Sequence, residues 1–200
     1  TIIEETDEYI IRKDDDGWER KYFKNSKLVE IVRPVVTCPE DWYRLKERAF
    51  GELEKYYTDE NIQSKYSPFR EGHQRGDYSI RMNITGFFWT PRTLLGIEEH
   101  LFAFYDYPDM IKDMNEFCLG VFLDKLGKIL DILPADVLYI MEDLSGSNGP
   151  MLSPELFDEF IGAYYKRLVP FLKSKGVRHV FVDTDGNFNK LIPNFIESGI

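Results

Sequence analysis

Residues 137–143 read VLYIMED, and this stretch decides the fold class. A short strand that is apolar throughout, rather than alternating, indicates burial on both faces, as in a parallel sheet under helices. Residues 78–84 are also strand-like and residues 179–182 form another short apolar run, and sequence with helical spacing follows each one. This βα alternation predicts an α/β fold, either a doubly wound sheet or a β/α barrel.

The predicted helices begin at recognisable caps. Ser153 is typical of an N-cap, followed by a first-turn proline and an acid, and Pro170 is expected to kink or shorten the helix that starts there. Apolar positions also recur with helical spacing over 94–105 and 108–122. The chain holds only three βα units, whereas a closed eightfold barrel typically needs ~250 residues. We therefore expect any barrel to be incomplete here and the chain to be a segment of a longer protein.

The domain organisation is predicted from the sequence pattern, which changes near residue 78 to alternating strand-like and helix-like segments. Residues 1–57 predict a β-hairpin, whose turn is the DDDG stretch at 14–17, and then a helix opening at Pro39; both form a peripheral part of the same domain. The three aspartates favour a solvated turn over a cation-binding loop. Residues 58–77 predict a connecting loop, and residues 78–200 the βα units.

Composition excludes several classes of function. Lysine and arginine number 25 against 35 aspartates and glutamates, and a net charge of −10 disfavours binding to nucleic acid or to an anionic membrane surface. With 43% hydrophobic and 15% aromatic residues, the chain predicts a globular protein. It lacks a bilayer-spanning apolar run of ~20 residues and a signal peptide, so we expect a cytoplasmic protein in which Cys38 and Cys118 are free thiols.

Acidic residues follow two of the predicted strands, at the sheet edge where α/β proteins place their sites. Glu142 and Asp143 end one strand and either orient a substrate and hold a proton or, for Asp143, merely cap the loop. Asp183 and Asp185 share one face if their strand persists that far. Such a pair suits a hard cation, a proton or a basic group, and D-x-D-G-N is also good turn chemistry.

The remaining strand end, residues 83–92, reads NITGFFWTPR. An apolar wall with one arginine suits a flat or acidic ligand, although an aromatic cluster of this kind is also typical of plain core. The three histidines share no metal-binding spacing with the cysteines. Nucleotide-binding glycine loops and the G-x-S-x-G elbow of serine hydrolases are absent from the sequence.

Three segments, in this order and spacing, resemble the uroporphyrinogen decarboxylase superfamily: FWTP at 88–91, the Glu142-Asp143 strand end with LSPELFDEF at 152–160, and VDTDGN at 182–187. The similarity covers about residues 78–200, and the sequence before residue 58 looks more like the methyltransferase-like branch. The resemblance implies a TIM barrel, incomplete in this chain. The superfamily includes cofactor-free porphyrinogen decarboxylases and zinc enzymes that move methyl groups between corrinoid proteins and thiols or other acceptors.

The chain departs from both branches at residues that matter. Leu94 is the nearest position to a substrate-binding tyrosine of the decarboxylases, and the family's loop serine corresponds to Ser147. Where the corrinoid methyltransferases have H-x-C-G-N with two zinc ligands, residues 183–187 read DTDGN. Exchanging imidazole and thiolate for carboxylates turns a soft site into a hard one, so the usual zinc–thiolate site is not expected. Whether Asp183 and Asp185 hold another metal stays open.

The resemblance and its departures together predict an enzyme that transfers a methyl group between a corrinoid (cobamide) and an acceptor without zinc–thiolate chemistry. The corrinoid is either a substrate or a group on a partner corrinoid protein, and the acceptor is a small molecule such as a pterin. The alternatives are a cofactor-free uroporphyrinogen decarboxylase and a non-catalytic corrinoid- or tetrapyrrole-binding protein. The expected catalytic residues are Asp183, Asp185, Glu142 and Asp143, and the expected substrate-binding residues are Asn187, Ser147, Trp89 and Arg92.

Overall fold

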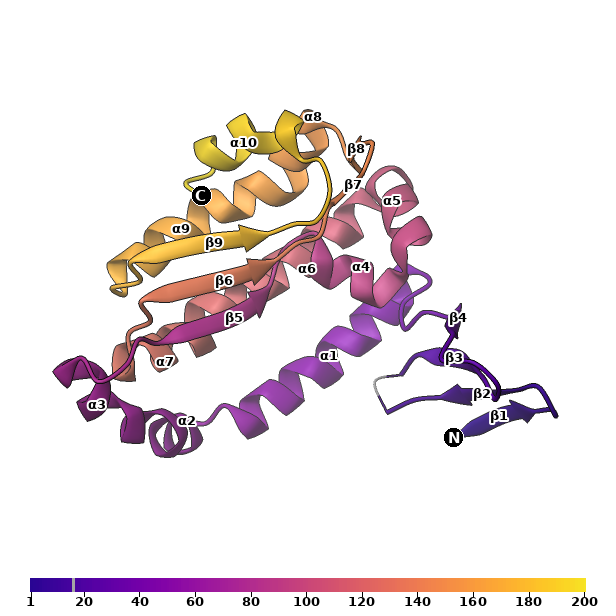
Figure 1. The fold of residues 1–200 in the computed structure, drawn as a ribbon, viewed down its shortest axis with the longest axis horizontal. Helices are drawn as coiled ribbons and strands as arrows, with labels where there is room; N and C mark the ends of the chain where they lie inside the picture. The colour runs from indigo at the N-terminus through magenta and orange to yellow at the C-terminus, as the bar shows by residue number, and fades with distance from the viewer. Residues whose placement is uncertain (16) are drawn as a thin grey trace.

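The computed structural model describes residues 1–15 and 17–200 (Figure 1). Its centre is a parallel sheet in the order β5-β6-β9, made of β5 (Arg81–Thr85), β6 (Val137–Met141) and β9 (His179–Asp183). All three predicted strands are present, with boundaries that shift by a few residues. The carboxyl ends of all three strands therefore meet at one edge.

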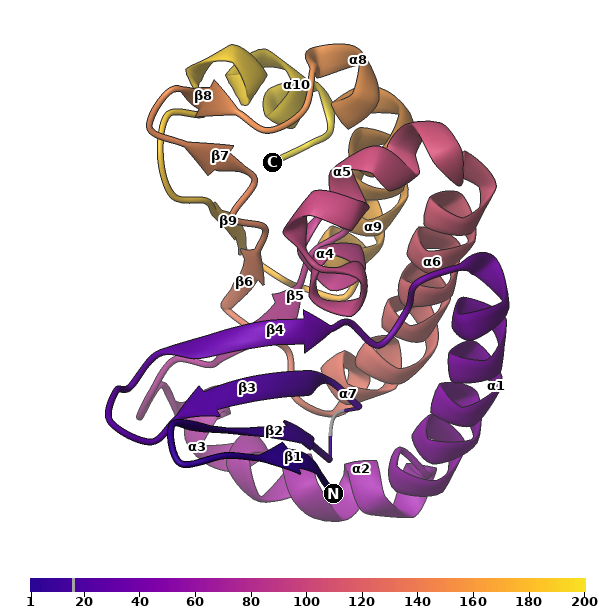
Figure 2. The same cartoon turned by 90° about the vertical axis from the view of Figure 1, so that its right-hand side faces the viewer.

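Helices cover one face of this sheet in the described chain, and Figure 2 shows α4, α5, α6 and α9 on the same side of it. Met82, Leu138 and Ile140 point toward these helices, whereas Phe181 on the opposite face is 55% exposed. The expectation that both faces are buried is wrong for the described residues, because no second layer lies against the opposite face. The parallel α/β fold is confirmed, but no closed barrel is present among these residues.

Two long helical stretches pack against the sheet, each carrying a π-helical segment in its middle. One consists of α6 (Pro108–Val121), a π-helix (Phe122–Leu126) and α7 (Gly127–Ile132). The other consists of α8 (Pro154–Phe157), a π-helix (Asp158–Gly162) and α9 (Ala163–Ser174). The Ser153 cap is confirmed, because its side chain accepts the Leu156 N–H at 3.3 Å. The prediction that Pro170 shortens this helix is wrong, since α9 continues to Ser174.

Shorter elements complete the units. The helix predicted at 94–105 is two helices, α4 (Trp89–Leu95) and α5 (Ile97–Asp106), separated by Gly96 at φ 82°. The loop after β6 holds a small hairpin of β7 (Ser145–Gly146) and β8 (Gly149–Pro150), and the sequence after β9 forms a 3-10 turn (Asn189–Leu191) and α10 (Ile192–Glu197).

The N-terminal strands form a four-stranded antiparallel sheet (Figure 1). It comprises β1 (Ile2–Glu5), β2 (Tyr9–Lys13), β3 (Glu19–Phe23) and β4 (Val29–Arg33). The predicted hairpin is confirmed as β2 and β3, whereas β1 and β4 were not predicted. The predicted DDDG turn includes Asp16, which lies outside the described residues. Asp14 is not simply solvated there, because it pairs with Arg12 and Arg20 at 2.7 Å each.

Helix α1 (Pro39–Tyr56) begins at Pro39 as expected and joins the N-terminal part to the helical layer. Its Trp42 packs edge-on against Phe117, with ring centroids 5.7 Å apart, and donates its indole N–H to Asp113 at 2.7 Å. One side chain of α1 thus contacts two side chains of α6. This burial of Trp42 ties α1 to α6.

The prediction of a connecting loop over 58–77 is wrong. The segment is mostly helical: α2 (Asp59–Tyr66), a 3-10 turn (Ser67–Phe69) and α3 (Arg70–Arg75). The side chain of Thr58 caps α2 by accepting the Asn61 N–H at 3.2 Å, and Gly76 ends α3 at φ 81°. The segment is polar because these helices are largely exposed, not because it is a loop.

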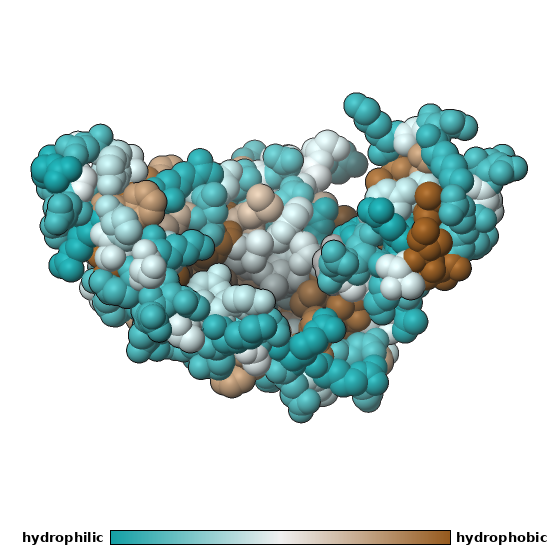
Figure 3. Space-filling model, turned by 90° about the horizontal axis from the view of Figure 1, so that it is seen from below, coloured by the Kyte–Doolittle hydropathy of each residue, from teal (hydrophilic) through white to brown (hydrophobic). Residues whose placement is uncertain are grey.

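Seen from below in Figure 3, the molecule is hollowed between its two ends, and pale to brown residues floor the hollow. The fully buried core lies on the helical side of the sheet and includes Leu138, Ile140, Phe157 and Leu168. Across residues 1–15 and 17–200, no helix combines the length and apolar character needed to cross a membrane.

Candidate active site

The loops that follow β6 and β9 are joined at the carboxyl edge of the sheet. The backbone N–H groups of Glu142 and Asp143 both donate to the Asp183 carbonyl, at 2.9 and 3.2 Å. The Leu144 N–H then donates to the Thr184 hydroxyl at 3.1 Å. These bonds hold the loops after β6 and β9 against one another, so the backbones of the predicted strand-end residues of the two strands lie together at this edge.

Asp143 and Arg92 form the ionic contact on the β5 side of this edge. Asp143 has a left-handed backbone at φ 43°, and Arg92 Nη1 donates both to its carbonyl at 2.6 Å and to its Oδ2 at 3.2 Å. The guanidinium of Arg92 also lies over the Trp89 ring, 5.0 Å from its centroid. The structure thus brings together Trp89, Arg92 and Asp143, which the sequence places at the ends of two different strands.

The placement of Asp183 and Asp185 differs from the shared strand face that the sequence pattern predicts. Strand β9 ends at Asp183, so the condition for a shared strand face at 183 and 185 is not met. Both carboxylates nevertheless act on the hydroxyl of Tyr139, which lies on the open face of β6. Hydrogen bonding to Asp183 raises the pKa of Tyr139. Burial and the negative charges of Asp183 and then Asp185 raise it further, whereas the positive charge of Arg81, which lies over the Tyr139 ring, lowers it.

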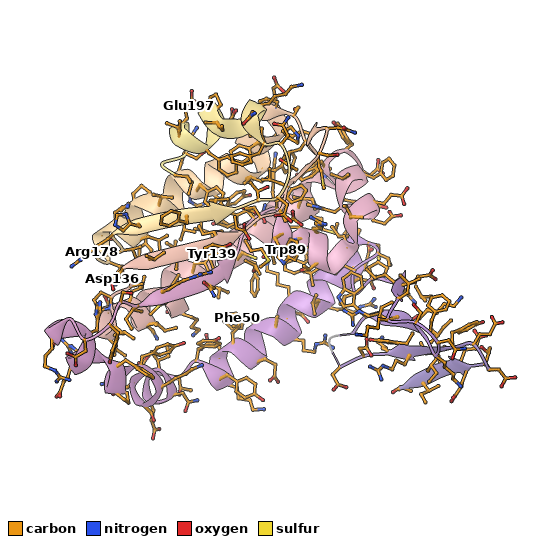
Figure 4. The ribbon with its side chains drawn as sticks, in the orientation of Figure 1. Phe50, Trp89, Asp136, Tyr139, Arg178 and Glu197 are labelled. Atoms are coloured by element: carbon orange, nitrogen blue, oxygen red, sulfur yellow. The ribbon has the colours of Figure 1, made fainter. Side chains whose placement is uncertain are left out.

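Tyr139 is the functional candidate that sequence reasoning missed. It lies two positions before Met141, the register partner of Asp183, so the two side chains are diagonal neighbours on one sheet face. The alternation of side chains along β6 shows that Tyr139 and Met141 share a face. Only the register of β6 and β9 shows which residue of β9 lies opposite them. Figure 4 shows Tyr139 on the sheet and Trp89 beside its carboxyl edge.

Glu142 is turned the other way, into the interior. Its carboxylate is fully buried and accepts the backbone N–H groups of Phe87, Phe88 and Trp89 at 2.9, 2.8 and 3.0 Å, together with the Tyr165 hydroxyl. Burial raises the pKa of Glu142 to about 7, against these hydrogen bonds, which lower it. The structure therefore places Glu142 beneath the edge, where it holds the first turn of α4.

Gly86 makes this arrangement possible. A Cβ atom at this position would lie 2.1 Å from the Glu142 carboxyl carbon, so only glycine lets the carboxylate approach the start of α4. Gly86 also donates its N–H to the Met141 carbonyl at 2.8 Å, which continues the β5–β6 pairing past the strand. The sequence shows the glycine, but it does not show which side chain needs the space.

Ser147 and Asn187 lie in the outer part of the same loops. The Asn187 N–H donates to the Gly146 carbonyl at 2.8 Å, and the side-chain oxygen of Asn187 accepts the Asn189 N–H at 3.2 Å. Asn187 therefore orders its own loop. Ser147 is exposed between β7 and β8. Their binding of substrate stays a prediction.

The donor set at this edge does not fit a zinc site. Within residues 1–15 and 17–200, no group of three or more histidines, cysteines, aspartates and glutamates is placed to hold a metal ion. The thiol of Cys118 is enclosed by protein, and burial raises its pKa to about 12, which keeps it protonated. Zinc prefers imidazole and thiolate ligands, and neither is present beside Asp183 and Asp185.

Comparison with known proteins finds a likeness in fold to solved structures. No family profile and no curated protein sequence matches the chain. Among solved structures, it is similar to a methyltransferase from Methanosarcina mazei, with a TM-score of 0.51 and 14% sequence identity, over 62% of this chain and 35% of that one. The chain thus spans about a third of that protein's length. At this identity the likeness shows the fold alone, an α/β arrangement like part of a methyltransferase.

Proposed function

We propose that this chain is part of an enzyme of the uroporphyrinogen decarboxylase superfamily that transfers a methyl group between a corrinoid and a small-molecule acceptor. The observation that carries the proposal is the gathering of acidic strand ends at the carboxyl edge of the sheet, where the backbone N–H groups of Glu142 and Asp143 donate to the Asp183 carbonyl and the Asp143 side chain holds Arg92. Parallel α/β folds place their reactive groups at this edge. The likeness in fold to part of a methyltransferase supports the class of reaction.

Proton transfer is the contribution that these residues can make. When an acceptor takes a methyl group, its lone pair forms the new bond, its proton must leave, and the corrinoid retains the electron pair of the broken cobalt–carbon bond. A carboxylate beside the acceptor takes that proton as a general base. We assign this part to Asp183, and to Asp185 the orientation of the acceptor's donor groups. An acceptor with several N–H groups, such as a pterin, suits two carboxylates.

The opposite wall suits recognition of a flat ligand. Trp89 offers an aromatic face, and Arg92 offers positive charge held in place by Asp143. Glu142 acts through α4, because it fixes the helix turn that carries Trp89. These residues orient a ring system against Asp183 without taking part in the bond changes.

A porphyrinogen decarboxylase is the second candidate, and the carboxylate-only donor set at Asp183 and Asp185 favours it. A carboxylate stabilises positive charge that develops on a pyrrole ring without help from a metal ion. The two reactions differ in what they consume: the decarboxylase needs a porphyrinogen and releases carbon dioxide, and it has no use for a methylated corrinoid.

An anaerobic absorption titration of the full-length protein with methylcobalamin tests the proposal. A thiol and tetrahydrofolate serve as alternative acceptors, and conversion to the spectrum of reduced cobalamin reports transfer. Asp183→Asn is expected to slow conversion by about a hundredfold, the usual worth of a general base. Asp7→Asn is the control, since Asp7 precedes β2, in the N-terminal sheet.

Each outcome decides between the candidates. Conversion that is equally fast in Asp183→Asn contradicts the assignment of the base. A spectrum that never changes with either acceptor, together with carbon dioxide release from a porphyrinogen, replaces methyl transfer by decarboxylation. Saturable cobalamin binding with neither reaction identifies a non-catalytic binding protein.

A further inference from the structure

A cavity lies at the opposite end of the sheet from the candidate active site. It measures about 610 Å³ and is bounded by α3, the turn before β6 and the turn before β9. Figure 4 shows Asp136 and Arg178 together at this end of the sheet, far from Trp89. A volume of this size is within the ~300–1,000 Å³ range of small-molecule sites.

The lining of this cavity is basic, although the protein as a whole carries a net charge of −10. Its charged or ionisable side chains are Arg70, His73, Arg75, Arg178 and, as the one carboxylate among the described lining residues, Asp136. Of the three guanidinium groups that line the cavity, those of Arg70 and Arg178 are the least opposed by carboxylates, and they make a local positive potential that favours anions. The sequence alone hides this feature, since the basic residues come from segments more than a hundred positions apart.

Asp136 offsets only one of the three positive charges, and its oxygens already have hydrogen-bond partners. Its Oδ2 accepts the Ile80 N–H and lies against His73 Nε2, at 2.8 Å each. These contacts, the Ile80 N–H first, hold the pKa of Asp136 below its usual value. Arg178 reaches the other oxygen only at 3.7 Å. Asp136 thus holds the backbone just before β5 and the side chain of His73 in place. The guanidinium N–H groups of Arg178 therefore stay available to hydrogen-bond another partner.

The other two arginines are similarly accessible. Within the described part of the chain, Arg70 has no ion-pair partner. Arg75 pairs with Asp77 at 2.8 Å and with Glu71 at 3.9 Å, but its side chain is 63% exposed, and exposed pairs contribute little to stability and exchange readily. Gly76 and Gly176 leave the rim without side chains.

We propose that this cavity binds a phosphate-bearing small molecule through Arg70 and Arg178. The planar guanidinium fork matches the oxygens of a phosphate and donates two hydrogen bonds at once, which a lysine cannot do. His73 and Arg75 complete the positive lining. The proposal is independent of methyl transfer, because the cavity lies at the amino ends of the strands.

Calorimetric titration of the full-length protein at low ionic strength tests this binding, with inorganic pyrophosphate and ribose 5-phosphate as the two probes. Arg70→Gln and Arg178→Gln are each expected to weaken binding of the preferred probe by about tenfold. Arg167→Gln is the matched control: it removes the same charge, but Arg167 pairs with Glu116 on the surface between α9 and α6. Far-ultraviolet circular dichroism verifies that each variant folds.

Tighter binding of ribose 5-phosphate identifies a phosphate ester as the natural ligand, and tighter binding of pyrophosphate identifies an inorganic anion. Arg70→Lys separates geometry from charge, since it keeps the charge and removes the fork; it should recover only part of the affinity. The absence of saturable binding overturns the proposal. Equal weakening in Arg167→Gln also overturns it, because it would mean that the anion responds only to the overall charge.

Discussion

Glu142 and Asp143 are neighbours in the sequence with the same chemical group, and the structure gives them opposite surroundings. Asp143 adopts φ 43° and turns toward Arg92, while Glu142 is fully buried among four donors. A reversal of side-chain direction follows from the pleat of a strand, so the sequence could predict that one acid faces inward. The sequence could not predict that the backbone N–H groups at the start of α4 lie within hydrogen-bond distance of the inward-facing acid.

His100 is a second buried polar residue, and it lacks hydrogen bonds. Its ring lies between Phe88 and Phe104, at centroid distances of 4.7 and 4.8 Å, and neither ring nitrogen has a partner within the described chain. Burial, aided by the charge of Arg92, lowers the pKa of His100 to about 3. The folded protein therefore keeps this imidazole neutral.

This burial predicts a pH-dependent loss of stability that His100→Leu removes. Between pH 6.5 and 3 the unfolded chain binds a proton that the folded chain refuses, so the stabilisation present above pH 6.5 is lost as the pH falls. From pH 6.5 to 5, the free energy of unfolding of His100→Leu should therefore gain about 2 kcal/mol on that of the wild type. Urea unfolding at several pH values measures this difference.

Comparison with wild type is needed because Glu142 acts in the opposite direction. Its pKa is raised to about 7, so its contribution to stability is present at low pH and is lost as the pH rises toward and through 7. Taking the difference between two proteins cancels this contribution. His179→Leu is the control, since His179 is exposed. A pH-independent difference for His100→Leu would contradict the neutral burial of His100.

At the scale of elements, the two site loops depend on a close approach of glycines. Gly186 has φ 77°, and a Cβ atom there would lie 2.5 Å from the Gly146 carbonyl oxygen. The same carbonyl accepts the Asn187 N–H. The D-x-D-G-N motif therefore needs its glycine for contact with the loop after β6 as well as for the turn.

Gly186→Ala should destabilise the protein by separating these loops. Gly76→Ala is the matched control, because Gly76 has a similar φ of 81° but open space around the missing Cβ. The control is expected to lose about 1–2 kcal/mol, the cost of a left-handed backbone with a side chain. Urea unfolding should show a clearly larger loss for Gly186→Ala. Equal losses would mean that the loops do not pack as closely as the structure shows.

Element boundaries show what local sequence could predict. The first-turn proline at Pro39, the cap at Ser153 and the strand-like runs of β5, β6 and β9 predicted their elements. The sequence predicts a loop over residues 58–77, because this segment is polar and interrupted by proline and glycine. Their helices lie at the surface, where the apolar face that would reveal a helix is narrow.

At the scale of the whole molecule, the open face of the parallel sheet is the main departure from expectation. Phe181 and Met141 are apolar and exposed on it, at 55% and 37%, next to Tyr139. Parallel sheets are ordinarily covered on both faces. The strands have the apolar composition of a sheet that is buried on both faces. Within the described residues, helices cover only one of these faces.

Paired substitutions measure this asymmetry. Ile140→Ala, on the helix-covered face, should lower the free energy of unfolding by about 2–5 kcal/mol, because it leaves a cavity in the core. Phe181→Ala on the open face should change it by less than about 1 kcal/mol, because an exposed side chain loses little contact. Urea unfolding of the 200-residue chain measures both. A loss at Phe181 as large as that at Ile140 would show that the open face is covered in solution.

The sequence by itself determined the βα order, the strand positions and the acids at the strand ends, because each depends on neighbours within a few residues. Tertiary structure alone decided that Glu142 serves α4, that Tyr139 faces Asp183, and that Arg70 and Arg178 share a cavity. These outcomes depend on strand register and on packing between segments far apart in the chain. No local pattern encodes such distances, because burial and electrostatic fields are properties of the assembled fold.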